Sequence, residues 1–180
     1  ENPEENELQH YYTMPLEKSQ ELRYGENAHQ KAALYLTADH KGAFGGMEQF
    51  QGKELSYNNI RDLDVAWKAV SAYNKFVKNA DSVKSDDGSS VNFATTEGSV
   101  FTIALKHNTP CGAALGKDAL DSYKKTYECD PVSIFGGIIG CSGTIDKDAA
   151  EEMVKGFLEV IVTPDFTEEA LEVLKKKKNL

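Results

Sequence analysis

Apolar positions recur along the chain with two periods, and each period predicts one kind of element. Residues 32–36, AALYL, form a short apolar run that predicts a strand. Residues 60–80 place leucine, tryptophan, valine and tyrosine near helical spacing, which predicts an amphipathic helix capped by Asn58 or Asn59. Residues 99–107, SVFTIALKH, are rich in β-branched and aromatic side chains and predict a second strand, followed directly by a Pro-Cys-Gly turn.

The second half of the chain continues this alternation. Helices are expected at 118–130, 146–158 and 167–180, and strands at 132–143 and 159–166. The last helix is expected to close on four lysines, which suit the negative end of a helix dipole. Strands that alternate with helices predict an α/β fold with a largely parallel or mixed sheet flanked by helices.

The length of 180 residues fits one domain with a sizeable core. The opening ENPEENELQ is acidic and rich in Asn, so residues 1–20 are expected to be a lead-in or linker and residues 21–180 the domain. Polar residues at 81–98 predict a loop. The chain stops directly after its last expected helix, which fits a natural end or a cut through something larger.

Composition narrows the function classes. No apolar run approaches the roughly 20 residues that a bilayer requires, and no signal-like segment opens the chain, so no membrane partner is expected. A net charge of −9 argues against nucleic acid but leaves room for a phosphorylated small molecule. Three cysteines without CxxC spacing indicate a reduced, cytoplasmic setting.

The run KHNTPCGAALG raises two possibilities for Cys111: a zinc ligand and a catalytic nucleophile. Pro110-Cys111 resembles the start of the zinc-deaminase motif P-C-x-x-C, but Ala114 stands at its second cysteine and the chain has no H-x-E. We therefore expect no metal. A catalytic thiolate at Cys111 is less expected than a small cysteine packed beside a turn, and Cys129 and Cys141 are expected to be core residues.

The adjacent Lys106 and His107 end the expected strand at 99–107, the end of a strand where α/β proteins bind ligands. A cation beside an imidazole disfavours imidazole protonation, and a neutral imidazole is what a general base requires. From the pair alone, a solvated lysine and a hydrogen-bonded histidine at the start of a loop remain the favoured interpretation.

Two other stretches favour a functional interpretation of Lys106 and His107. LRYGENAHQ places Arg23 and Tyr24 beside a glycine in a polar loop, which suits an anion such as phosphate. IFGGIIG places Gly136 where the backbone can approach a flat ligand closely.

Five ordered motifs, which extend from about residue 22 to residue 180, together resemble a known family. LRYGENAHQ, LSYNNIRDLDVAW, KHNTPCGAALG, YECDPVSIFGGII and EVIVTPDFTEEALEVLKKKKNL are similar to the transformylase region of the bifunctional purine-biosynthesis family that combines AICAR formyltransferase with IMP cyclohydrolase. AICAR is 5-aminoimidazole-4-carboxamide ribonucleotide, and the co-substrate implied is 10-formyltetrahydrofolate. The resemblance implies that His107 is the proton acceptor and that Lys106 stabilises the transition state.

The resemblance also implies a nucleotide pocket. Arg23 and Tyr24 would contact the ribonucleotide, with Arg23 at its phosphate. Gly136 would contact it through the backbone, Glu159 would bind it as an acidic residue, and Asn59 is a weaker candidate for the same pocket.

The implied fold is the first of two cytidine-deaminase-like α/β subdomains, without the second subdomain or the upstream cyclohydrolase domain. The active sites of the family form across a homodimer, so the implied partners are a second copy or the missing subdomain. Two alternatives stay open. One is a non-catalytic module that binds the nucleotide weakly or not at all, and the other is a metal-free deaminase, which would need a water-activating group besides His107.

Overall fold

The computed structural model describes residues 11, 13–79 and 98–180. Most of the expected lead-in, and the expected loop at 81–98 apart from Gly98, lie outside the described residues. Residues 16–20, which the sequence analysis included in the lead-in, form the first part of a strand.

A four-stranded sheet lies at the centre of the described fold, with the strand order β4-β3-β5-β6. Strand β3 (Val100–Lys106) pairs antiparallel with both β4 (Thr109–Gly116) and β5 (Gly137–Cys141). Strand β6 (Leu158–Val162) pairs parallel with β5 and forms one edge of the sheet. The predicted α/β class with a mixed sheet is confirmed.

The strand β4 corrects the sequence analysis, which placed a Pro-Cys-Gly turn where this strand runs. His107 and Asn108 have φ values of 52° and 61°, so the chain reverses within two residues, as in a type I′ hairpin turn. Pro110 is tolerated in β4 because this strand is a sheet edge, where a missing N–H need not remove a ladder hydrogen bond.

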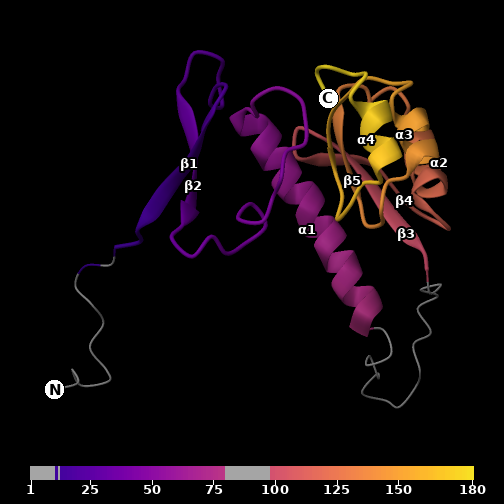
Figure 1. Ribbon diagram of the computed structural model, residues 1–180, viewed down its shortest axis with the longest axis horizontal. Coiled ribbons are helices and arrows are strands. Elements are labelled where there is room, and N and C mark those ends of the chain that lie inside the picture. The colour runs from indigo at the N-terminus through magenta and orange to yellow at the C-terminus, as the bar shows by residue number, and fades with distance from the viewer. Residues whose placement is uncertain (1–10, 12, 80–97) are drawn as a thin grey trace.

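Helices cover both faces of the sheet, which gives three layers (Figure 1). Helix α1 (Tyr57–Asn79) lies on one face, and α2 (Ala119–Cys129), α3 (Lys147–Met153) and α4 (Glu168–Leu174) lie on the other. The expected helices and strands on either side of residue 130 are thus present, but α4 ends before the four lysines rather than on them.

The alternation of side chains along the strands explains the two cores. Ile103, Leu105 and Ile138 are buried together with Ala66 of α1. Their neighbours along the strands, Ala104 and Ile139, point to the other face and join the larger cluster with α2, α3 and α4. Because both faces of the sheet are buried, these strands have nearly continuous apolar sequences.

Helix α1 begins three residues earlier than expected, and its cap is Ser56 rather than an asparagine. The Ser56 Oγ accepts a hydrogen bond from the backbone N–H of Asn59 at 3.2 Å. The Asn59 Oδ1 in turn accepts from the Ser56 N–H at 3.1 Å, which is the reciprocal pattern of a capping box. Asn58 and Asn59 are therefore inside the first turn of the helix.

A separate hairpin precedes α1. Strand β1 (Leu16–Leu22) pairs antiparallel with β2 (Ala32–Thr37), the strand expected at 32–36. Leu22 at the end of β1 is buried with Leu55 and Leu63, and this small cluster joins the hairpin to α1. The sequence LEKSQEL of β1 is mostly exposed and polar, so it carried no signal of hydrophobic alternation.

Candidate functional site

Two backbone hydrogen bonds place the end of β1 beside the start of α1. The N–H of Arg23 donates to the Leu55 carbonyl at 2.9 Å, and the N–H of Tyr57 donates to the Tyr24 carbonyl at 3.0 Å. The Arg23 guanidinium lies 5.0 Å from the centre of the Tyr24 ring, and Nη2 is 3.4 Å from the Tyr24 hydroxyl. Tyr24 thus orients a guanidinium that has no acidic partner among the described residues.

The capping box holds Asn59 in a fixed rotamer. Because Asn59 Oδ1 is occupied by both the N–H and the hydroxyl of Ser56, its Nδ2 points away from the cap. That Nδ2 donates to Glu159 Oε2 on β6 at 2.8 Å. Asn59 is buried (7% exposed), whereas Glu159 is exposed, and its bond to Asn59 uses only Oε2.

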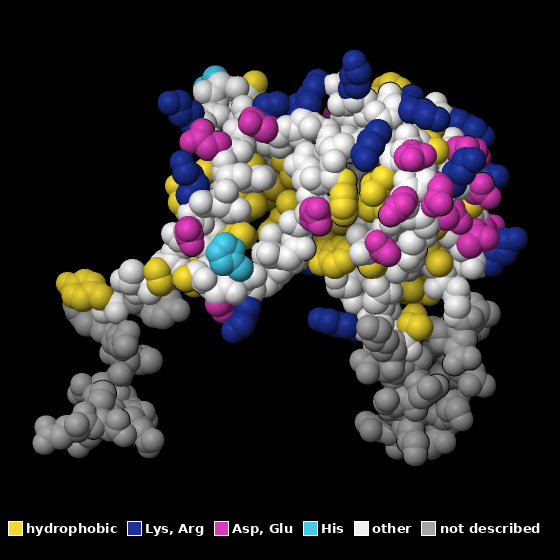
Figure 2. Space-filling model, viewed as in Figure 1, with side chains coloured by type: hydrophobic (Ala, Val, Ile, Leu, Met, Phe, Trp, Pro, Cys, Tyr) yellow, Lys and Arg dark blue, Asp and Glu magenta, His cyan; other side chains and the backbone are white. Residues whose placement is uncertain are grey.

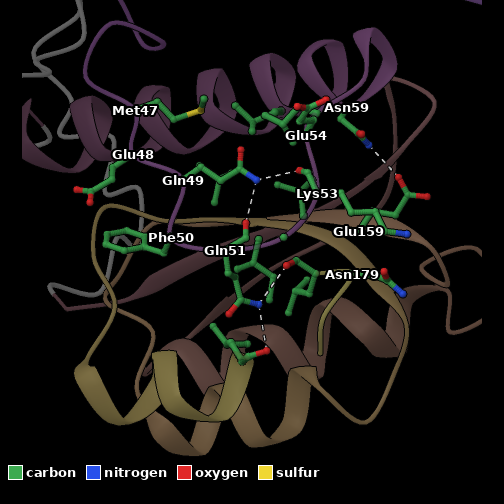
Figure 3. Close-up of a pocket in the computed structure, with 18 of the residues that line it drawn as sticks. Met47, Glu48, Gln49, Phe50, Gln51, Lys53, Glu54, Asn59, Glu159 and Asn179 are labelled. Carbon is green, nitrogen blue, oxygen red and sulfur yellow. Dashed lines mark hydrogen bonds between the residues drawn. The ribbon is translucent and has the colours of Figure 1, made fainter. Parts of the chain in front are cut away.

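Arg23, Asn59 and Glu159 share the wall of one pocket of about 330 Å³. Figure 3 shows α1 along one side of this pocket, with Asn59 and Glu159 at one end and Phe50 at the other. In the space-filling view, hydrophobic side chains gather in the hollow between the β1–β2 hairpin and the rest of the molecule (Figure 2). The pocket therefore combines an apolar lining with a few polar groups at one end, the usual composition of a small-molecule site.

His107 lies in a different place. It lines a smaller pocket of about 100 Å³ with residues of the first turns of α1 and with its neighbour in the hairpin turn: Asn58, Arg61, Asp62 and Asn108. The backbone N–H of Asn108 donates to Asp62 Oδ1 at 2.6 Å and fixes the turn against the helix. Asn59 and Leu63 line the larger pocket from the neighbouring face of α1.

Lys106 and Gly136 meet at the turn that precedes β5. The Lys106 Nζ donates to the Phe135 carbonyl at 2.8 Å, and the Gly136 N–H donates to the Phe157 carbonyl at 2.8 Å. Gly136 has φ of 70°, a conformation that favours glycine. Because Phe157 also lines the larger pocket, this turn borders it.

The structure thus brings together Arg23, Asn59 and Glu159 in one pocket, with Tyr24 against Arg23. It does not place Lys106, His107 or Gly136 in that lining. Sequence reasoning missed the segment at 47–55, which supplies much of the wall. That segment has no periodic pattern, and its lining residues include Met47, Glu48, Gln49, Phe50, Gln51, Lys53 and Glu54.

The cysteines differ from one another in environment. Burial raises the pKa of the Cys111 thiol, which favours the thiol over the thiolate, and burial likewise raises the pKa of Cys141. Cys141 is a core residue, as expected, but Cys129 is exposed at the end of α2, where its Sγ donates to the Lys125 carbonyl. The expectation that Cys129 is a core residue was wrong: this cysteine is exposed, and its Sγ lies over the edge strand β4, 3.9 Å from the Ala113 carbonyl.

In the part of the chain that the structure describes, no group of three or more His, Cys, Asp or Glu side chains is placed to hold a metal ion. Within the same residues, no helix is both long enough and apolar enough to cross a membrane.

The fold and the pocket define the class: an α/β domain with a pocket of the size and lining typical of small-molecule sites, beside the edge strand β6 of a mixed sheet. Comparison with known families narrows this class, because the model of the AICARFT/IMPCHase bienzyme family matches residues 1–180. The chain belongs to the AICARFT/IMPCHase bienzyme family.

Individual relatives agree with this assignment. The chain is 51% identical over 176 residues to the bifunctional purine biosynthesis protein PurH of Clostridium acetobutylicum, and 50% identical over 177 residues to PurH of Clostridium beijerinckii. It is 46% identical over 176 residues to PurH of Clostridium botulinum strain Hall. Each alignment covers 98% of this chain, and the chain spans 30% of the length of each relative.

Proposed function

We propose that this chain carries the general base and part of the nucleotide pocket of an AICAR formyltransferase, which moves a formyl group from 10-formyltetrahydrofolate to the 5-amino group of AICAR. The observation that carries the proposal is the pocket that unites Arg23, Asn59 and Glu159, which are far apart in the sequence. Family membership supports the same reaction, because its description names both enzyme activities.

The chemistry assigns a distinct role to each polar group. The Arg23 guanidinium suits the phosphate, since it is charged, oriented by Tyr24 and not paired with a described carboxylate. The Glu159 carboxylate, held by Asn59, suits the N–H or O–H donors of the nucleotide. The backbone at Gly136 has no side chain to obstruct a flat ring.

The reaction joins the amino nitrogen of AICAR to the formyl carbon and breaks the bond from that carbon to N10 of the folate. The amino group is a weak nucleophile because its lone pair is delocalised, and it loses a proton as the new bond forms. In this scheme the amino group of the bound nucleotide reaches His107 past the first turn of α1, where Asn58 lines the smaller pocket and Asn59 the larger one. His107 takes that proton, Lys106 stabilises the negative charge on the formyl oxygen, and the leaving nitrogen gains a proton. No step in this scheme calls for a metal, and 10-formyltetrahydrofolate acts as a co-substrate.

The proposal also covers the type of subdomain, its partner in the active site and its cellular location. The mixed sheet with helices on both faces is compatible with a cytidine-deaminase-like subdomain, the first of two in a transformylase. A second subdomain or a homodimer partner would supply further substrate and folate contacts, and the protein would act in the cytoplasm. Because the chain spans 30% of its relatives' length, the alternative is a non-catalytic module that binds the nucleotide weakly or not at all.

The test of the pocket is AICAR binding, measured by isothermal titration calorimetry. We expect Arg23→Ala to weaken binding about 10-fold or more, because a charged hydrogen bond to phosphate is worth about 1.5–3 kcal/mol. Lys147→Ala is the matched control, since this exposed lysine on α3 pairs with Glu151 and does not line the pocket. Equal affinity of the wild type and Arg23→Ala would contradict the assignment.

A further inference from the structure

The turn that carries His107 has two successive non-glycine residues at positive φ. A type I′ turn requires positive φ at both central positions and is usually built from Asn-Gly or Gly-Gly, whereas here the pair is His107-Asn108, with φ of 52° and 61°. Positive φ is uncommon for non-glycine residues, although Asn and His adopt it more readily than most, and two in succession are held in place by the surrounding structure. The question is which group holds this turn.

The contacts of the turn answer that question. Asp62 Oδ1 accepts the backbone N–H of Asn108 at 2.6 Å. With the Asn108 amide oriented to satisfy both of its ends, its nitrogen donates to the same Asp62 Oδ1 at 2.7 Å, and its oxygen accepts from the Arg61 guanidinium at 2.7 Å and 3.1 Å. All three residues line the small pocket together with His107.

The N–H of Asn108 has no place in the ladder between β3 and β4, whose last pair is Lys106 with Thr109. Its hydrogen bond in the structure comes from outside the hairpin. Asp62, in the second turn of α1, accepts that N–H. This bond links the hairpin turn to a helix that is not part of the sheet. The carboxylate thus fixes the turn to α1, and His107, one residue before Asn108, is placed with it.

We propose that Asp62 is a positioning residue for His107: its carboxylate anchors the His107-Asn108 turn to α1 and so sets where the imidazole lies. The role of the imidazole as a base rests on the function proposed above, but the anchoring does not. Asp62 acts through the backbone of Asn108 rather than on the substrate. An error of about 1 Å in a reacting group can cost about 100-fold in rate, so this anchor matters for transfer.

The first test is structural and needs no activity. Nuclear Overhauser contacts between the His107 ring and α1, and the exchange rate of the Asn108 amide, are measured by NMR in the full chain. In Asp62→Ala we expect the ring contacts to be lost and the amide to exchange ~10-fold faster. In Asp62→Asn both are retained, because the amide oxygen still accepts from Asn108. Unchanged contacts and exchange in Asp62→Ala would overturn the proposal.

The second test separates positioning from a general loss of stability. In formyl-transfer assays we expect Asp62→Ala to lower kcat ~10–100-fold with KM for AICAR within about 2-fold, and Asp62→Asn to restore most of kcat. Asp64→Ala is the matched control on the same helix, since Asp64 pairs with Lys68 and lines neither pocket. A change confined to KM, or equal effects of Asp62→Ala and Asp64→Ala, would overturn the proposal.

If the wild-type chain transfers no formyl group, the proposed reaction fails for this chain while the NMR measurements still decide whether Asp62 anchors the turn. If transfer occurs and the NMR contacts survive in Asp62→Ala, the reaction stands and the anchoring fails. The two proposals are therefore separable.

Discussion

Asn59 connects the stability of α1 to the proposed nucleotide pocket, so its replacement by alanine has two separable effects. The substitution removes the acceptor of two Ser56 hydrogen bonds, at 3.1 Å and 2.9 Å, and the donor to Glu159 at 2.8 Å. Ser56 is fully buried, so its N–H would be left unpaired and away from water. An unsatisfied buried donor costs about 1–3 kcal/mol.

We therefore expect Asn59→Ala to lower the free energy of unfolding by about 2–3 kcal/mol, as one unpaired donor plus part of a helix cap. For a domain of this size, that corresponds to a fall of about 4–12 °C in melting temperature. Urea unfolding followed by circular dichroism and by the fluorescence of the single tryptophan, Trp67, measures it. AICAR affinity, measured by calorimetry, falls in the same variant because Glu159 loses its partner.

Two matched variants separate the loss of stability from the loss of AICAR affinity. Ser56→Ala removes the cap hydroxyl but leaves the bond from Asn59 to Glu159, so we expect a loss of about 1 kcal/mol in stability and an unchanged AICAR affinity. Glu159→Gln keeps an acceptor for Asn59 and should change stability by less than about 0.5 kcal/mol while weakening AICAR binding. The reasoning is refuted if Asn59→Ala is as stable as the wild type, or if Ser56→Ala weakens binding as much as Glu159→Gln.

Two further predictions concern the core. Burial raises the pKa of Tyr123 from 10.0 to about 12, so between these pH values the unfolded chain loses a proton that the folded chain keeps. Stability should then fall by up to about 2.7 kcal/mol from pH 10 to 12, and alkaline denaturation of Tyr123→Phe should lack this component. Gly137→Ala should cost about 1–3 kcal/mol in urea unfolding, since its Cβ would lie 2.9 Å from the carbonyl oxygens of Ile134 and Leu105. Gly156→Ala, with nothing within 4 Å, is its control, and equal losses would contradict the packing argument.

Hydrophobic periodicity predicted most of the fold, because most elements bury an apolar face. Among the described residues, the strands β2, β3, β5 and β6 and the four helices correspond to expected segments. Strand β1 was missed because it is polar and largely exposed. Strand β4 was missed because Pro110 and two glycines indicated a turn, whereas the reversal occurs at His107 and Asn108, which carry no glycine.

The sequence likewise identified some residues of the candidate site, whereas others could be recognised only from the structure. The motifs identified Arg23, Asn59 and Glu159, and the structure places them in one pocket although one hundred residues separate the last two. Sequence spacing could not show that His107 lines a second, smaller pocket beside α1, because that depends on the hairpin turn. Nor could it select Asp62, whose importance comes from a hydrogen bond to a residue 46 positions away.

The central claim is that His107 is the base in formyl transfer to AICAR. The most direct measurement is the rate of that transfer from 10-formyltetrahydrofolate, compared between the wild-type chain and His107→Ala. His29→Ala is the control, because this exposed histidine lines neither pocket. The account predicts transfer by the wild type and the control, and a fall of about 10²–10⁴-fold in His107→Ala. Equal rates in the wild type and His107→Ala, a zero rate included, would contradict it.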